Sequence, residues 1–224
     1  MKETFPLESF NYKLPEELIA QSPEPHRSNS KLLCINKKTT KIDHTSFSSL
    51  PEQLNNNDVL VLNNTKVMRS RVFCYRTSGA KIECFFLKNL GDHQWEVLLK
   101  KSQRLKINEI LHINTHNKIQ LIKKHNKTAV VKIQSNLDDL SFINQFGEIP
   151  LPPYIKQKNS HTFEESYQTI FASEPGAVAA PTASLHFTHN IFAQLKQKKI
   201  EIIYITLHIG LGTFNPIESD NIYE

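Results

Sequence analysis

Two segments of the chain hold the residues best suited to chemistry. The first, residues 167–188 (YQTIFASEPGAVAAPTASLHFT), contains Ser184 and His186, and the second, residues 206–214 (TLHIGLGTF), contains His208. An imidazole titrates near pH 6.5, so it can accept or donate a proton at neutral pH. Each histidine is therefore a candidate proton-transfer group in a pocket. The alternative at each position is a hydrogen-bonded histidine of the core.

The first segment has the composition of a buried or pocket-lining turn. No charged side chain lies between Gly176 and Thr188, whereas 22% of the whole chain is charged. Pro175 and Pro181 exclude one continuous helix. Small residues such as Gly176 let a second backbone or a ligand approach closely. We expect the two segments to face a common ligand.

Two familiar catalytic or binding motifs fit these segments poorly. Gly210 and Gly212 follow a predicted strand, as in a dinucleotide-binding loop, but the third glycine is absent and Pro216 interrupts the expected helix. Ser184 lies in no G-x-S-x-G turn, and its spacing from His186 does not match a serine hydrolase. The residues therefore favour a pocket that is neither a dinucleotide-binding loop nor a serine hydrolase site.

The cysteines and the apolar runs limit the class of protein. Cys34, Cys74 and Cys84 have no C-x-x-C spacing, so we expect buried free thiols and no metal site. No run of about 18 apolar residues could span a membrane, and the sequence MKETFPLESF at the start lacks the apolar stretch of a signal peptide. A cytoplasmic protein without a membrane segment is expected.

The two ends of the chain, residues 1–62 and 147–224, have the patterns of one mixed α/β body. Strands are predicted over 32–36, 58–63 and 200–209, short helices over 14–21 and 50–54, and a longer helix over 188–199 capped by Thr188. The strand over 58–63 (DVLVLN) is apolar on both faces, so we expect it to be internal.

Residues 63–146 form a separate insert of short strands. Six of them, over 67–76, 81–87, 94–99, 107–113, 119–123 and 128–133, alternate with polar turns. This spacing predicts a small antiparallel barrel or sandwich. A helix over 138–146 then returns the chain to the body. The expected fold class is an α/β body with an inserted antiparallel β-barrel domain.

Positive charge is concentrated in the insert. Residues 66–132 hold 15 Lys and Arg against four acidic residues, a surplus of +11, while the rest of the chain has a net charge of −6. Exposed lysines discourage edge-to-edge association of strands, but this surplus exceeds that need. We expect the insert to bind a phosphate backbone. The candidate contacts are Lys100, Lys101, Arg104 and Lys106 in one cluster, and Lys123, Lys124, Lys127 and Lys132 in the other.

Five strings of this sequence resemble the S-adenosylmethionine:tRNA ribosyltransferase-isomerase family of queuosine biosynthesis. They are FNYKLPEELIAQSPEPHRSNSKLL (10–33), DVLVLNNTKVMRSR (58–71), GEIPLPPYI (147–155), YQTIFASEPGAVAAPTASLHFT (167–188) and TLHIGLGTFNPI (206–217). They occur in the order found in the family and span almost the whole chain.

The resemblance implies an enzyme that transfers and isomerises the ribosyl moiety of S-adenosylmethionine onto 7-aminomethyl-7-deazaguanine in tRNA, giving epoxyqueuosine. S-adenosylmethionine would be a co-substrate, the modified tRNA the partner, and no metal would be needed. The enzyme would be a cytoplasmic monomer. The fold implied by the family, an α/β body interrupted by a β-barrel, agrees with the organisation inferred from pattern and charge.

The family's pocket motifs can be carried over to individual residues of this chain. His186 or His208 is expected to transfer a proton, and Glu148 to orient a group. The residues implied in binding S-adenosylmethionine are Asn63, Asn64, Thr65, Arg69, Arg71, Tyr167, Gln168, Pro181, Thr182, Phe187, Gly210, Gly212, Thr213 and Phe214.

The sequence departs from the family in two respects. Ser184 stands where family members usually have glycine, which adds a hydroxyl group to the pocket. Family members also continue past the equivalent of residue 224 with a segment that completes the body. Two alternatives therefore stay open: an inactive truncated remnant that binds tRNA through the basic insert, and a generic α/β protein that binds a small molecule.

Overall fold

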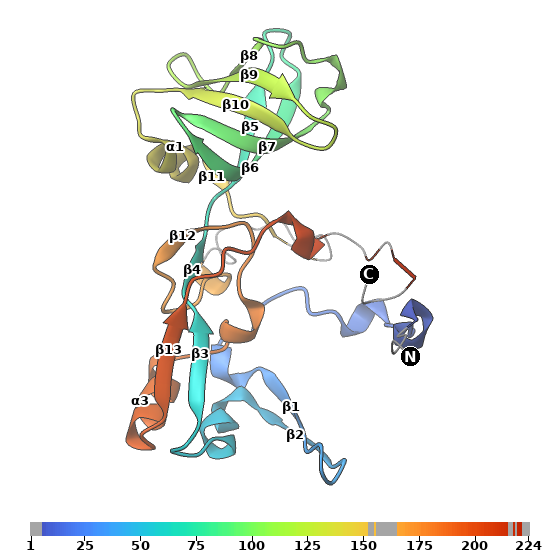
Figure 1. The fold of residues 1–224 in the computed structure, drawn as a ribbon, viewed down its shortest axis with the longest axis vertical. Coiled ribbons are helices and arrows are strands. Elements are labelled where there is room, and N and C mark those ends of the chain that lie inside the picture. Colours follow the sequence, from blue (N-terminus) through green and yellow to red (C-terminus); the bar gives the residue numbers. More distant parts are fainter. Residues whose placement is uncertain (1–5, 152–154, 156–164, 215–216, 218, 221–224) are drawn as a thin grey trace, which may run out of the picture.

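The computed structural model describes residues 6–151, 155, 165–214, 217 and 219–220. Within these residues the chain forms a β-barrel and an α/β body, joined next to strands β4 (Thr65–Val67) and β11 (Gly147–Glu148) (Figure 1). The fold class expected from the sequence, an α/β body with an antiparallel β-barrel, is confirmed.

Six antiparallel strands close the barrel. In order around it they are β5 (Arg71–Tyr75), β6 (Lys81–Gly91), β7 (Gln94–Lys100), β10 (Ala129–Gln134), β9 (Lys118–Lys124) and β8 (Ile110–His112). Tyr75 on β5 pairs with His112 on β8 and closes the ring. Alternate residues of β9 and β10 are buried, because successive side chains point to opposite faces of a strand. They pack with Phe86 and Trp95 in one core.

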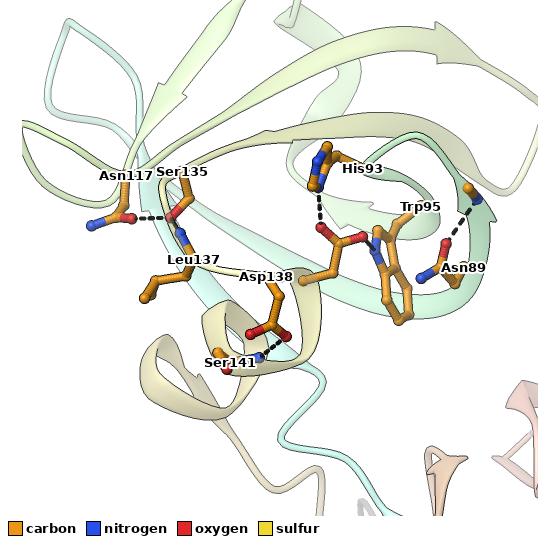
Figure 2. A network of polar contacts seen from close by, with 10 residues as sticks. Asn89, His93, Trp95, Asn117, Ser135, Leu137, Asp138 and Ser141 are labelled. Carbon is orange, nitrogen blue, oxygen red and sulfur yellow. Dashed lines mark hydrogen bonds and ion pairs between the residues drawn. The ribbon is translucent and has the colours of Figure 1, made fainter.

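Helix α1 (Asp139–Phe146) covers the end of the barrel that lies nearest the body (Figure 1). Its Phe142 is fully buried in the barrel core. The Asp139 carboxylate accepts hydrogen bonds from Nδ1 of His93 and Nε1 of Trp95, each at 2.7 Å (Figure 2). The helix is therefore held on the barrel by both apolar packing and side-chain hydrogen bonds.

Two pairs of parallel strands organise the body. Strand β3 (Val59–Asn63) pairs with β13 (Glu201–Ile205), and β4 pairs with β12 (Glu174–Ala177). A separate hairpin consists of β1 (Lys31–Ile35) and β2 (Ile42–Ser46). Among the described residues, the 3-10 segments are η1 (Leu7–Phe10), η2 (Glu16–Leu18), η3 (Arg27–Asn29), η4 (Phe47–Gln53), η5 (Ser102–Arg104), η6 (Thr182–Ser184) and η7 (Leu211–Phe214).

Helices α1 and α3 (His189–Gln197) each begin at a side-chain cap, and the cap at Thr188 was predicted. Asp138 accepts a hydrogen bond from the backbone N–H of Ser141 at 3.0 Å at the start of α1. Thr188 accepts one from Ile191 at 3.3 Å at the start of α3. Each bond satisfies a backbone donor that has no partner inside the helix. Helix α3 then packs on η4 and one face of β3 and β13.

The expectation that residues 58–63 form an internal strand is wrong. Strand β3 pairs with β13 alone among the described residues, and only the face that carries Leu62 packs into the core. Val59 and Val61 on the opposite face are 49% and 53% exposed. An apolar run indicates what a strand could bury, but it does not supply the second layer that would cover it.

Other boundaries also differ from the predictions. Residues 68–70 separate β4 from β5, because the backbone N–H of Met68 bonds to Ala177 as the chain leaves the body. Strand β13 ends at Ile205 rather than at residue 209, since the next backbone groups bond to the Asn63 side chain. The short helices at 14–21 and 50–54 are 3-10 turns, and Cys34 is only half-buried.

Candidate functional site

The two segments that carry the candidate catalytic histidines lie side by side in the body. The backbone N–H of Val178, from residues 167–188, donates to the carbonyl of Ile209, from residues 206–214, at 2.9 Å. Strand β12 within the first segment is paired with β4. Both segments therefore meet at the β4–β12 pair.

Asn63 and Asn64 hold the second segment in place. The Asn63 side chain donates from Nδ2 to the Leu207 carbonyl at 2.9 Å and accepts at Oδ1 from the Leu207 N–H at 3.1 Å. Oδ1 of Asn64 accepts a hydrogen bond from the Thr206 hydroxyl at 2.7 Å. These side chains, expected to contact a ligand, fix the backbone immediately before His208.

His208 lines a pocket between the body and the barrel. Its Nδ1 lies 2.8 Å from the hydroxyl of Thr65, a residue with no exposed surface. The pocket has a volume of about 540 Å³, and Gly176 and Gly210 also line it. From the barrel, Lys88, Asn89 and Trp95 contribute to the opposite wall.

His186 lines a different pocket, which shares no lining residue with the first. This second pocket has a volume of about 290 Å³, and Tyr167, Thr182 and Arg27 also line it. The centroid of the imidazole lies 5.3 Å from that of the Phe47 ring. Burial lowers the pKa of His186, and the nearby positive charge of Arg27 lowers it further. A hydrogen bond with the Arg27 backbone has the opposite effect, but the net shift of the pKa is downward. The imidazole is therefore neutral at pH 7.

Arg27 is the residue of this pocket that the sequence reasoning missed. Its guanidinium donates to three backbone carbonyls: those of Gln168 at 2.5 Å, Leu185 at 3.1 Å, and Glu165. Burial lowers its pKa, and the charge of Glu165 partly opposes this effect. The cation joins the two ends of the 167–188 segment. Only its place within the family-like string 10–33 could have drawn attention to it.

A third pocket, of about 470 Å³, shares Arg27 with the His186 pocket and is also lined by Arg69 and Gln168. The Gln168 side chain accepts a hydrogen bond from the N–H of Val67 at 3.0 Å and donates to its carbonyl at 2.8 Å. Nε of Arg69 donates to the carbonyl of Gly147 at 2.7 Å. A Cβ at position 147 would come within 1.6 Å of the Arg69 carbonyl, so this crossing requires glycine.

The other candidates lie outside these three pockets. Phe187 is buried in the body core against Phe47, and Pro181 precedes η6. Arg71 on β5 faces Glu83, while Glu148 on β11 is exposed. Gly212 and Thr213 are exposed in η7, and Phe214 ends that segment. The structure thus groups His186 with Tyr167 and Thr182, His208 with Gly210, and Arg69 with Gln168.

The two predicted basic clusters meet at one end of the barrel, except for Lys132, which lies within β10 and pairs with Gln94 and Gln120. Strands β5, β7 and β9 run in the same direction, because one strand antiparallel to both lies between β5 and β7 and another between β7 and β9. Strand β5 starts beside the body. The residues after β7 and β9 therefore lie at the end away from the body. Lys124 donates to the carbonyls of Ser102 and Leu105, which joins the clusters. We call this the basic rim: Lys100, Lys101, Arg104, Lys106, Lys123, Lys124 and Lys127, all exposed.

Two further observations concern the described residues as a whole. They contain no cluster of three or more His, Cys, Asp or Glu side chains arranged to hold a metal ion. None of their helices combines the length and apolarity needed to cross a bilayer.

Comparison with known proteins identifies the family. A sequence model described as a queuosine biosynthesis protein matches residues 7–224. The chain belongs to this family. Among its relatives, S-adenosylmethionine:tRNA ribosyltransferase-isomerase of Sulfurihydrogenibium is 41% identical over 96% of this chain. The proteins of the same name from Halothermothrix orenii and Coxiella burnetii are 39% and 38% identical over 96% and 99% of it.

These three relatives are longer than this chain. It spans 64% of the Sulfurihydrogenibium and Halothermothrix proteins and 65% of the Coxiella protein. A solved structure, S-adenosylmethionine tRNA ribosyltransferase from Thermotoga maritima, is 26% identical with a TM-score of 0.36, over 89% of this chain and 58% of that one.

Proposed function

We propose that this chain transfers and isomerises the ribosyl moiety of S-adenosylmethionine onto 7-aminomethyl-7-deazaguanine in tRNA. The product of that reaction is epoxyqueuosine, and the working location is the cytoplasm. The match of the family model to residues 7–224 carries the proposal, together with the names of the relatives.

The His186 pocket supports binding of the adenosyl donor. Its walls combine apolar side chains, including Tyr167, Leu185 and Ile155, with a few polar groups. Small-molecule pockets commonly have this composition. Because the imidazole of His186 is neutral at pH 7, it can accept a proton from the donor or hydrogen-bond to the departing adenine. Arg27 fixes the backbone on both sides of this pocket.

The basic rim supports binding of the tRNA. Its seven cations lie at the far end of the barrel from the body. A barrel strand of seven residues is about 23 Å long, so the rim would contact phosphates well away from the reacting base. Phosphate contacts of this kind position a nucleic acid without reading its sequence.

Release of adenine tests the proposal. The chain is incubated with S-adenosylmethionine and an anticodon stem-loop RNA that carries 7-aminomethyl-7-deazaguanine, and adenine and RNA mass are followed by chromatography and mass spectrometry. We expect adenine and a heavier RNA only when both substrates are present. His186→Gln should slow release, and His44→Gln, an exposed histidine on β2, should not. Absence of adenine release from the wild-type chain would contradict the proposal.

A second candidate function is tRNA binding without catalysis. The observation that favours it is the span of the chain, about 64% of the relatives' length, combined with a barrel that is closed and basic by itself. This candidate predicts that RNA binds with strong salt dependence while no adenine appears in the same assay.

A further inference from the structure

The imidazole of His208 contacts a buried hydroxyl at Nδ1, although the residue as a whole is exposed. Its Nδ1 lies 2.8 Å from Oγ1 of Thr65. Thr65 is completely buried on β4, whereas His208 itself is exposed. A buried hydroxyl that bonds to an exposed ring fixes the direction of the ring, because the hydroxyl cannot move without losing its packing.

Gly176 fixes the plane of the same ring. A Cβ built on Gly176 would lie 2.6 Å from Cε1 and 2.7 Å from both Nδ1 and Nε2 of His208. Near-equal distances to three ring atoms mean that the face of the imidazole lies over the glycine. Any side chain at position 176 would displace the ring. The glycine therefore provides the room that the imidazole occupies.

The contacts of the Thr65 hydroxyl favour one tautomer of His208. Oγ1 of Thr65 also lies 3.5 Å from the carbonyl oxygen of Glu174, to which a hydroxyl can only donate. When the hydroxyl donates to this carbonyl, it accepts from the N–H at Nδ1 of His208. Nε2 is left without a proton, and its lone pair can accept one.

The pocket that His208 lines has the chemistry expected of a nucleotide site. Its apolar walls include Leu87 on the barrel and Val178 and Ile209 on the body. The cation Lys88 and the amide of Asn89 lie on strand β6, beside two irregularities in its pairing with β7. Strand irregularities of this kind often redirect side chains next to active sites. A planar base fits the apolar walls, and a phosphate fits Lys88.

We propose that Thr65 and Gly176 are positioning residues that present Nε2 of His208 as the proton acceptor for the primary amine of the substrate nucleotide. The identity of that nucleotide rests on the proposed function. His208 is the group that touches the substrate, and the other two act through it.

The proton transfer is balanced without any further reagent. A primary ammonium group has a pKa of about 10, so at neutral pH the aminomethyl group has no free lone pair. Transfer of one proton breaks one N–H bond and leaves its electron pair on the amine nitrogen, which becomes the nucleophile. The proton forms a bond to Nε2 and converts His208 to the imidazolium ion, which returns it to water afterwards.

Nitrogen-15 NMR of the imidazole rings tests the positioning. In the wild-type chain we expect the His208 proton on Nδ1 and a pyridine-like resonance from Nε2. Thr65→Ser should keep this pattern. Thr65→Val removes the acceptor and should shift His208 towards the tautomer with the proton on Nε2, and Gly176→Ala should do the same by displacing the ring. Thr45→Val, a matched control whose hydroxyl bonds to Ser49 on the far side of the body, should leave His208 unchanged.

The wild-type spectrum decides the tautomer even if a variant fails to fold. A His208 proton found on Nε2 in the wild type would overturn the proposal, as would an unchanged spectrum in a folded Thr65→Val variant. Titration with the modified anticodon stem-loop RNA should shift the His208 resonances, and absence of any shift with bound RNA would remove the nucleotide from this pocket.

Turnover in the adenine-release assay gives the second test. We expect His208→Ala to lower kcat by roughly 100-fold or more, and Thr65→Val to lower it by a smaller factor that Thr65→Ser restores. Full turnover in His208→Ala would overturn the proposal. If the wild-type chain releases no adenine, the proposed function and the amine assignment fail together, while the NMR result on Thr65 and Gly176 still stands or falls by itself.

Discussion

The barrel and the body bury their apolar side chains to different extents. The barrel has one continuous core in which Phe86, Val97 and Leu111 have no exposed surface. The buried residues of the body are divided between two smaller clusters. On the outer face of its β3–β13 sheet, Val61 and Ile203 remain 53% and 43% exposed.

This difference indicates how the two regions divide the work. A closed barrel has no free strand edges and can be stable by itself, so it suits a rigid support for a charged surface. Parallel strands are normally covered on both faces, and those of the body are covered on one. Each of the three pockets described above lies in the body or between the body and the barrel. The larger buried apolar core thus lies in the barrel, and the candidate catalytic residues lie in the body.

Cysteine alkylation should give the largest contrast between the regions. Burial raises the pKa of Cys74 to about 12, and burial together with the nearby Cys74 raises the pKa of Cys84 well above its usual value. Both lie in the barrel core, whereas Cys34 lies half-buried on the β1 hairpin. Because only accessible thiolates react, we expect Cys34 to be labelled at pH 7.5 and the other two to react on the order of 10³-fold more slowly, after barrel opening.

Peptide mapping after a timed iodoacetamide pulse measures these rates. In Cys34→Ser, labelling of the native chain should be almost abolished, while labelling in urea should recover two sites. Equal rates at all three cysteines under native conditions would show that the barrel opens as readily as the body.

Truncation of the barrel core should have the next largest effect. Phe86 is fully buried and makes edge-to-face contacts with Trp95 and Phe142. Phe86→Ala should therefore lower the free energy of unfolding of the barrel by about 3–5 kcal/mol. Urea unfolding followed by tryptophan fluorescence reports this region selectively, because Trp95 is the only tryptophan of the chain.

The control for this prediction is Phe10→Ala, at a side chain that is 51% exposed. It should change the free energy of unfolding of the barrel by less than about 0.5 kcal/mol. A loss below about 1 kcal/mol in Phe86→Ala would mean that the barrel core is not the stable unit described above.

Much of the barrel was predictable from the sequence, and much less of the body was. Short alternating strands with polar turns indicate an antiparallel barrel, since burial alternates along each strand. The outer face of β3 was not predictable, because a strand's own residues do not reveal whether a second layer covers it. Only the tertiary structure shows that Val59 and Val61 stay about half exposed.

The candidate site was predictable in its segments but not in its grouping. The type and spacing of His186 and His208 singled out both, and hydrogen bonds bring their segments together. Their separation into different pockets follows from the placement of β4 and β12, which residue types do not encode. Arg27 was missed because an arginine that donates to backbone carbonyls leaves no pattern in the sequence.

The pH dependence of stability should show the smallest effect. Because the pKa of His186 is lowered in the folded chain, the unfolded chain binds more protons than the folded chain at pH values between the lowered pKa and the usual value of 6.5. The stability linked to His186 is therefore fully present above about pH 6.5 and is lost as the pH falls below it. Urea unfolding followed by circular dichroism at pH 5.5 and 7.5 should show a smaller difference in His186→Gln than in the wild type. A difference in His186→Gln as large as that in the wild type would mean that His186 is not the source.

Salt-dependent RNA binding tests most directly whether the barrel holds the RNA while the body holds the chemistry. The affinity for the modified anticodon stem-loop is measured from 50 to 300 mM KCl, for the wild type, for Lys123→Glu/Lys127→Glu on the basic rim, and for Lys37→Glu/Lys38→Glu in the exposed β1–β2 turn. The rim variant should bind more weakly and lose roughly 0.7–0.9 from the log–log salt slope for each phosphate contact removed. The turn variant should match the wild type. Equal losses in the two variants, or none in the rim variant, would contradict this account.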